Sequence, residues 1–312
     1  MKKLTLFLLT GVLLVALFSC GSGDTHSAMS DPFSKTPVEG LTFEALTNKL
    51  SVMALLEKEG SFAVTTDWGD GEKSCCGFKK DGEKTLGYSE ADTSYARIFD
   101  GTSVLYVQNK GLLYTVMHFG TDYAQVVSDA FLYNVRLSAL DEENTGFGTN
   151  LLDDSTAEAR CTFYASTLWA DYLSGGDTSV KRNDYISVYI ELDAELYITA
   201  ITYSRVSDSG AYEKLMTQSF SYGTQLTYPE TKLDWQNAER FTVTVTDLDS
   251  DDAASETFSV PSGSRITNDI YDTDSSEIYF FTDKYNILPY FLNTDEFIVK
   301  ADTEVFISKT CG

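Results

Sequence analysis

Short runs that alternate between apolar and polar residues, separated by glycine turns, restrict the fold of this chain more than any other feature. Residues 61–119 contain the runs SFAVTTDW, SYARIF, TSVLYVQ and LLYTVMHF. The turn sequences between runs, such as Asp81-Gly82 and Asp100-Gly101, are typical of tight hairpins. Alternation with a period of two puts every second side chain on the same face of a sheet. The region therefore predicts a meander of about six antiparallel strands.

Two stretches with helical spacing lie on either side of the meander. Apolar residues recur every three or four positions in Thr42–Glu59, and Gly60 follows as a helix stop. Asp122–Leu140 has the same spacing and predicts a second amphipathic helix. The acidic segment that follows, residues 141–155, has the composition of a loop.

Strands resume after this loop in four runs, which are ARCTFYAS, DYISVYIEL, ELYITAITYSRV and YEKLMTQSFSYG. A sheet of about ten strands tends to curl, and its concave face then needs a cover. The two predicted helices can provide that cover. The expected fold class is α+β, mainly β: a curved antiparallel sheet, or open half-barrel, covered by helices. Its interior is either filled by side chains or left as a ligand cavity, and the sequence allows both outcomes.

The last part of the chain, residues 233–312, predicts a small all-β module. Its alternating runs are ERFTVTVTDL, ASETFSVP, SEIYFFTD, DEFIVKA and TEVFIS. One acidic turn, with Asp247, Asp249 and Asp251, resembles the first half of a calcium loop. However, Phe258 stands where that loop needs a glutamate. We therefore expect a solvated hairpin turn there and no metal site.

The first residues have the pattern of an export signal. Two lysines precede the apolar run Leu4–Phe18, which is shorter than the roughly 20 residues needed to span a bilayer as a helix. The run ends in LFSC, residues 17–20, which resembles the lipobox of bacterial lipoproteins. The resemblance implies that residues 1–19 are a signal peptide and that the Cys20 thiol receives a diacylglyceryl anchor.

A polar segment follows the anchor position. Residues 20–41 are mostly small and polar and include prolines, a composition that predicts a flexible tether. Two acyl chains on Cys20 would give durable attachment to a membrane. We therefore expect a lipid-anchored, extracytoplasmic protein at the cell membrane or outer envelope, with the membrane as its partner at Cys20.

The order of the predicted elements resembles the LolA-like superfamily, which includes lipoprotein carriers, the sensor domain of RseB and mycobacterial lipoproteins of the LppX type. The phrases that carry the likeness are ARIFDGTSVLYVQNKGLLYTV, YIELDAELYITAITYSRV and FSYGTQLTYP. The likeness covers residues 42–230. It implies an open half-barrel whose concave apolar face can hold acyl chains. The family has no fixed ligand residue to transfer to a position of this sequence.

The chain is strongly acidic. Its formal net charge is −24, and loss of two signal-peptide lysines leaves 21 basic residues against 47 acidic ones, a net charge of −26. Nucleic-acid binding needs a basic surface, so the charge argues against a nucleic-acid partner. The acidic residues predict a solvated exterior.

Cysteines and histidines give little support for catalysis. Apart from Cys20, the chain has Cys75, Cys76, Cys161 and Cys311, and four cysteines allow three pairings in an oxidising compartment. Adjacent cysteines rarely bridge each other, so we expect Cys75 or Cys76 to pair with Cys161. The chain has two histidines, one in the tether and His118 in an alternating run. With no recognisable nucleophile or metal motif, we predict no enzyme, no catalytic residue and no cofactor.

The sequence is compatible with two functions. The first is non-catalytic binding of a lipid or other apolar ligand in a half-barrel cavity, which predicts a large apolar space under residues 124–140. The alternative is an envelope protein–protein interaction or sensing module without a small-molecule ligand. It predicts a filled core together with an exposed aromatic or edge-strand patch.

Overall fold

The computed structural model describes residues 37–266, 279–281 and 297–308, apart from residues 70, 93–94, 109–110, 117–120, 153–155, 175–178 and 251–253. Cys20, Cys311, both histidines, the signal peptide and most of the tether lie outside the described residues.

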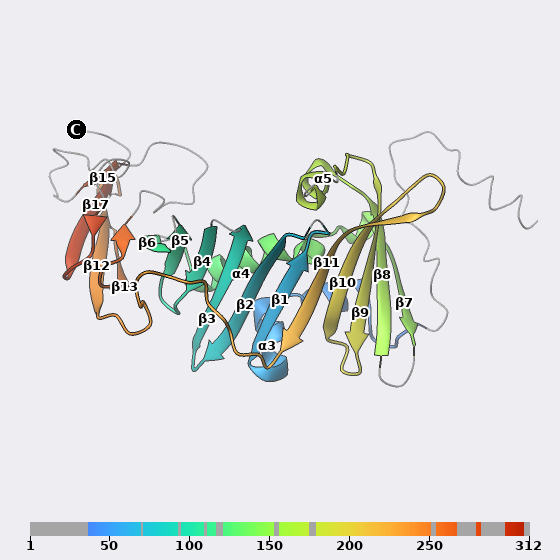
Figure 1. Ribbon diagram of the computed structural model, residues 1–312, viewed down its shortest axis with the longest axis horizontal. Helices are drawn as coiled ribbons and strands as arrows, with labels where there is room; N and C mark the ends of the chain where they lie inside the picture. The colour runs from blue at the N-terminus through green and yellow to red at the C-terminus, as the bar shows by residue number, and fades with distance from the viewer. Residues whose placement is uncertain are drawn as a thin grey trace, which may run out of the picture.

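A thirteen-stranded sheet dominates the fold (Figure 1). It is curved and does not close, and its neighbouring strands are antiparallel except for the pair β6–β14. The predicted α+β, mainly β fold class with a curved antiparallel sheet is confirmed. Its first eleven strands along the chain are β1 (Ser61–Asp67), β2 (Lys73–Asp81), β3 (Lys84–Asp92), β4 (Tyr95–Phe99), β5 (Val104–Gln108), β6 (Leu112–Val116), β7 (Gly146–Leu151), β8 (Thr156–Tyr164), β9 (Tyr185–Asp193), β10 (Ile198–Val206) and β11 (Tyr212–Tyr222).

The strand order joins two meanders at the middle of the sheet. The order is β16-β14-β6-β5-β4-β3-β2-β1-β11-β10-β9-β8-β7, so β1 lies beside β11 rather than at an edge. Their register places Phe62 opposite Tyr222 and Val64 opposite Phe220. The predicted six-strand meander β1–β6 is confirmed, and Gly82 and Gly101 in its turns have φ values of 62° and 91°. Glycine adopts this left-handed conformation without the steric cost of a side chain.

Three helices cover one face of the sheet, which we call the inner face. They are α2 (Phe43–Asn48), α3 (Val52–Glu59) and α4 (Tyr123–Asn134), and Figure 1 shows α3 and α4 behind the strands. The single helix predicted for residues 42–59 is two helices, because Ser51 has extended backbone and its hydroxyl accepts from the Ala54 N–H. That contact starts a new helix instead of continuing the first.

Two further elements differ from the sequence-based expectations. The segment predicted as an acidic loop contains β7, which pairs along its whole length with β8 at the sheet edge. Helix α5 (Thr167–Leu173) follows β8 and was not predicted; its Ser166 cap accepts from the Trp169 N–H. The helix predicted over 122–140 ends at Asn134 and continues as the 3-10 turns η1 (Arg136–Ala139) and η2 (Glu142–Asn144).

The C-terminal strands divide between two sheets. A second sheet has the order β13-β12-β17-β15, from β12 (Arg240–Asp247), β13 (Ser255–Pro261), β15 (Tyr279–Phe281) and β17 (Thr303–Ser308). It has a small core of its own that includes Val243, Val245 and Val305. However, β14 (Arg265–Ile266) and β16 (Phe297–Ile298) extend the large sheet beyond β6. The C-terminal region therefore packs as a continuation of the large sheet as well as a β module.

Candidate functional site

Aromatic side chains fill the space between α4 and the sheet. Phe62, Phe78, Phe99 and Phe131 are each fully buried. The Phe131 ring from α4 meets the ring of Phe62 edge-on at 5.7 Å between centroids and that of Phe78 at 6.2 Å. Contacts of this kind have the density of a protein core. The space between α4 and the sheet, where the lipid-binding hypothesis places an apolar cavity, is occupied here by these side chains.

A buried hydrogen-bond network closes the other end of the interior. The carbonyl of Asn134, the last residue of α4, accepts from Gln218 Nε2 at 2.6 Å and from Tyr172 Oη at 2.6 Å. The Gln218 amide also donates to Thr66 Oγ1 at 3.2 Å, while its Oε1 accepts from Tyr203 at 3.5 Å. Burial raises the pKa of Tyr172 and of Tyr203 far above the ordinary value. These hydroxyls therefore stay protonated and hold α4, α5 and β11 together.

The cysteines expected to form a disulfide are free thiols. Cys76 and Cys161 are buried on the inner face, and Cys75 is half-buried on the opposite face. Four strands lie between β2 and β8, which puts the two strands about 24 Å apart along the sheet. A disulfide needs Cα atoms within about 7 Å, so the expected bridge to Cys161 is not formed. Burial raises the pKa of the Cys161 thiol to about 12, and that of Cys76 also rises.

Tyrosines gather on the opposite, outer face of the sheet. The β8–β9 register pairs Tyr164 with Tyr185 and Arg160 with Tyr189, and all four side chains alternate with buried inner-face residues. The Tyr164 and Tyr185 rings lie 5.3 Å apart. Tyr212, at the start of β11, completes the group. We call these five residues the outer aromatic surface.

Arg160 is held at the centre of this surface. Its guanidinium carbon lies 5.7 Å from the ring centres of both Tyr189 and Tyr212, and its Nη1 donates to Tyr212 Oη at 3.3 Å. Tyr189 Oη in turn donates to Glu158 Oε2 at 2.6 Å. Burial, followed by the hydrogen bond and charge of Glu158, raises the pKa of Tyr189 to about 12. These contacts restrict the side chains before any partner arrives.

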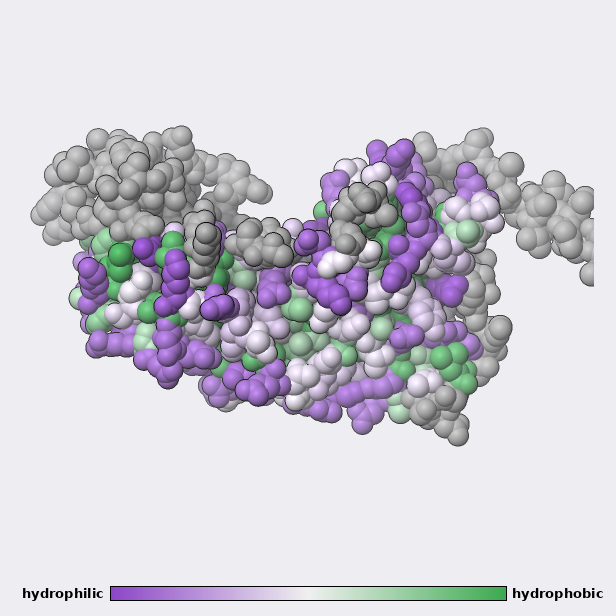
Figure 2. Space-filling view, in the orientation of Figure 1, coloured by the Kyte–Doolittle hydropathy of each residue, from purple (hydrophilic) through white to green (hydrophobic). Residues whose placement is uncertain are grey.

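The surface stays accessible despite these contacts. Tyr212 is 55 % exposed and Tyr164 is 43 % exposed. Figure 2 shows the outer face, which is pale over the central strands because serine and threonine side chains alternate there with buried ones. Large aromatic side chains left in solvent beside a small-residue face are a feature of interaction surfaces.

The sequence contains a signal for this surface. Arg160 and Tyr164 occupy the polar positions of the run ARCTFYAS, and Tyr185 and Tyr189 occupy the same positions of DYISVYIEL. Period-two alternation predicts that these residues face away from the core. Aromatic residues at solvent-facing positions of paired strands would have identified the patch.

The described residues hold no group of three or more His, Cys, Asp or Glu side chains that could bind a metal ion. Among the helices in the described part of the chain, none is long and apolar enough to cross a membrane. No protein-family model matches the chain, and no curated protein sequence matches it significantly.

Proposed function

We propose that this chain is a non-catalytic, lipid-anchored interaction module that binds an envelope protein through its outer aromatic surface. The observation that carries the proposal is the contrast between the two faces of the sheet. The inner face is filled by aromatic side chains, whereas Tyr164 and Tyr212 on the outer face are left in solvent. The lipobox at Cys20 and the tether of residues 20–41 support a location outside the cytoplasm.

The composition of the outer aromatic surface supports a protein partner. Tyrosine and arginine are over-represented among the residues that dominate binding energy at protein interfaces. Tyrosine loses little rotamer freedom on binding, and Arg160 is already held between two rings, so the ordering cost of association is reduced. The acidic exterior adds repulsion toward acidic partners and favours a partner with a neutral or basic contact surface.

A lipid or other apolar ligand inside the half-barrel is the competing function. It needs room between α4 and the sheet, where Phe62, Phe78 and Phe131 now touch one another. Moving one such ring out of a core costs about 3–5 kcal/mol, judged from large-to-small substitutions. The filled interior therefore favours the interaction module.

Site-specific photo-crosslinking tests the proposal. A photoreactive amino acid replaces Tyr212 in the full-length protein in the producing cells, and a second strain carries it at Tyr133, an equally exposed tyrosine on α4. We expect a crosslinked species of discrete mass at position 212 and none at 133. Equal crosslinking at both positions, or none at 212, would contradict the proposal.

Native mass spectrometry tests the competing function directly. The sample is the mature chain from residue 20 with Cys20 replaced by alanine, so that no covalent acyl chain is present. We expect the mass of the polypeptide alone after incubation with phospholipid. A bound lipid of discrete mass that is lost on organic extraction would favour the half-barrel ligand instead.

A further inference from the structure

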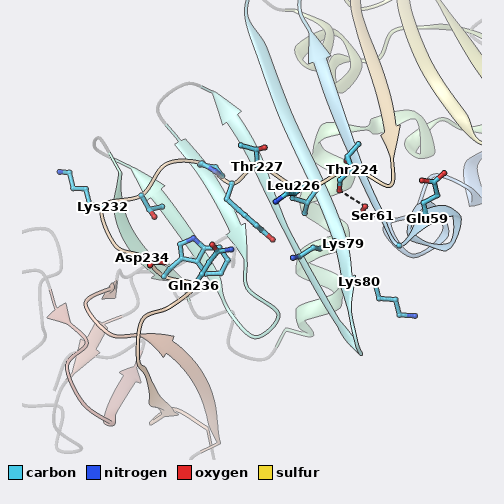
Figure 3. A pocket seen from close by; sticks show the side chains of 16 residues that line it. Glu59, Ser61, Lys79, Lys80, Thr224, Leu226, Thr227, Lys232, Asp234 and Gln236 are labelled. Atoms are coloured by element: carbon cyan, nitrogen blue, oxygen red, sulfur yellow. Dashed lines mark hydrogen bonds between the residues drawn. The ribbon is translucent and has the colours of Figure 1, made fainter.

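A polar groove lies between the outer face of the sheet and the connection from β11 to β12. We call this connection, residues 223–239, the strap. The groove has a volume of about 1090 Å³. Figure 3 shows that its walls come from the end of α3, the β2 strand and the strap. Its position is separate from the outer aromatic surface, which lies on β8, β9 and β11.

The strap is fixed to the sheet at both ends. Gly223 N–H donates to the Ser61 carbonyl at 2.9 Å, and Ser61 Oγ donates to the Thr224 carbonyl at 3.0 Å. At the other end the Lys232 N–H donates to the Gly111 carbonyl at 2.8 Å. The groove is therefore a formed part of the fold.

Aromatic packing holds the middle of the strap close to the strands. The Tyr228 ring lies 5.8 Å from Tyr88 of β3 and 5.2 Å from Trp235. Gly77 of β2 is needed for the close approach, because a Cβ there would come within 2.9 Å of the Leu226 side chain. The same packing places the Tyr228 hydroxyl in a low-dielectric position at the groove.

Two residues that line the groove have hydroxyl groups that are buried without partners in the described part of the chain. Thr224 Oγ1 and Tyr228 Oη make no hydrogen bond to any described residue. A buried hydroxyl without a partner costs about 1–3 kcal/mol, so native proteins rarely keep one without a reason. Burial, followed by the negative charge of Asp81, raises the pKa of Tyr228 to about 12, so its hydroxyl is a donor at neutral pH.

The lining of the groove has a small excess of basic side chains in an acidic protein. Its lining has Lys79, Lys80 and Lys232 against Glu59 and Asp234, whereas the whole chain has a net charge of −24. Figure 3 shows the Lys79 side chain directed into the groove, toward Gln236 of the strap, while Lys80 and Lys232 project outward at opposite ends. One ammonium group therefore dominates the interior of the groove.

The acids of the lining do not neutralise Lys79. Asp234 accepts from the Asn237 side chain at 2.8 Å, and the Glu59 carboxylate packs against Gly223 at the end of the strap. Within the described residues, Lys79 has no ion pair, although it is half-buried. A partly buried ammonium without a counter-ion favours an anionic ligand.

We propose that the groove binds a small anionic ligand through a carboxylate or phosphate group. Lys79 supplies the counter-charge, and the hydroxyls of Tyr228 and Thr224 donate hydrogen bonds to the anionic oxygens. The two anion types share the chemistry that the groove recognises, and the choice between them is made by experiment. This binding is independent of the protein partner proposed for the outer aromatic surface.

Isothermal titration calorimetry on the mature Cys20→Ala chain tests the proposal. The probes are inorganic phosphate and malonate, each titrated at constant ionic strength with chloride as the reference anion. We expect saturable binding of at least one probe and a loss of about tenfold or more in affinity for Lys79→Gln. Lys73→Gln is the matched control, because Lys73 lies on the same strand and face but outside the groove.

Tyr228→Phe separates a ligand-binding hydroxyl from a merely buried one. Removing an unpartnered buried hydroxyl should raise the melting temperature of the unliganded protein. If that hydroxyl donates to the ligand, the same variant should also bind the anion about tenfold more weakly. Tyr228→Phe is expected to fold well. Its binding can therefore be measured even if Lys79→Gln fails to fold. Failure of both probes to bind, or unchanged affinity in Tyr228→Phe, would overturn the proposal.

Discussion

Arg240 of β12 donates to the buried carboxylate of Asp100 in the β4–β5 turn, with 2.7 Å between Nη2 and Oδ2. The Asp100 side chain is only 1 % exposed and also accepts from the backbone N–H groups of Thr102 and Ser103, at 2.9 Å and 2.7 Å. One carboxylate thus shapes a hairpin turn of the large sheet and fastens the C-terminal β module to it. The Asp100-Gly101 sequence predicted the hairpin turn but not the contact with Arg240.

Replacing Asp100 should destabilise the protein strongly. Asp100→Ala leaves two backbone donors and the Arg240 guanidinium without their acceptor, and we expect a loss of about 2–4 kcal/mol in the free energy of unfolding. Urea denaturation measures this change. Asp208→Ala, in the exposed β10–β11 hairpin, is the control and should change stability by less than about 0.5 kcal/mol. Similar small effects for both variants would show that the junction carries little stability.

The Lys58–Asp193 ion pair should make stability depend on acid pH. Burial alone would raise the pKa of Asp193, but hydrogen bonds from Lys58 and from the Tyr197 and Glu195 N–H groups outweigh it and hold the pKa below its usual range. The pKa of an aspartate in the unfolded chain is about 3.9. Because the pKa of Asp193 is lower in the folded protein, its ion pair stabilises the fold at pH values above about 3.9. This stabilisation is lost as the pH falls through the pKa of the folded state.

Lys58→Met tests this pH dependence. The variant keeps an apolar stem against the rings of Tyr197 and Tyr222, which lie 4.8 Å and 4.6 Å from the Lys58 ammonium. We expect a loss of about 1–2 kcal/mol at pH 7. Denaturant melts from pH 7 to 2.5 should show the difference from the parent shrinking below about pH 4. A difference that stays constant over this range would mean that Asp193 is not the titrating group.

The reactivity of the three described cysteine thiols should depend on their burial, because none of them is in a disulfide. Under native conditions at pH 8, an alkylating reagent should modify half-buried Cys75 first, because burial keeps Cys76 and Cys161 protonated and covered. All three should react after denaturation without a reductant. Peptide mapping by mass spectrometry reads out each site. A Cys161-linked peptide pair in the non-reduced map would restore the disulfide that the sequence suggested.

Removing a core ring should open a cavity between α4 and the sheet. Phe131→Ala removes a fully buried ring, and we expect a loss of about 3–5 kcal/mol in the free energy of unfolding. Tyr133→Ala, two residues along the same helix but 58 % exposed, should cost less than about 1 kcal/mol. Calorimetric denaturation provides the comparison. A cost for Phe131→Ala as small as that of Tyr133→Ala would indicate an interior with spare room.

Membrane attachment should depend on Cys20 alone. In the Cys20→Ala variant of the full-length protein, we expect loss from the membrane fraction, since no thiol remains to carry the acyl chains. Fractionation followed by immunoblotting measures the distribution. The parent protein should gain the mass of a diacylglyceryl group on an N-terminal peptide that begins at residue 20. An unmodified N-terminus at another residue would indicate an ordinary signal peptide.

Several local features of this fold could be predicted because neighbouring residues specify them. The turns at Gly82 and Gly101 and the strands of the first meander follow from period-two alternation and the conformational freedom of glycine. The end of α3 at Gly60, which has a φ of 70°, follows in the same way. The break at Ser51 was missed because helical spacing of apolar residues continues across it, while a capping hydroxyl interrupts the backbone.

The sequence by itself determined the period of the first-meander strands, the sites of their turns and the excess of negative charge, all of which can be read from the residues alone. Only the tertiary structure decided that β11 lies beside β1, that aromatic rings fill the space between α4 and the sheet, and that Lys79 faces a groove beneath the strap. These features depend on side-chain volumes and contacts between residues more than a hundred positions apart, such as Phe62 and Tyr222. The alternation of apolar and polar residues does not show whether side chains fill the space between sheet and helices, because the same alternation is compatible with a packed interior or an empty one.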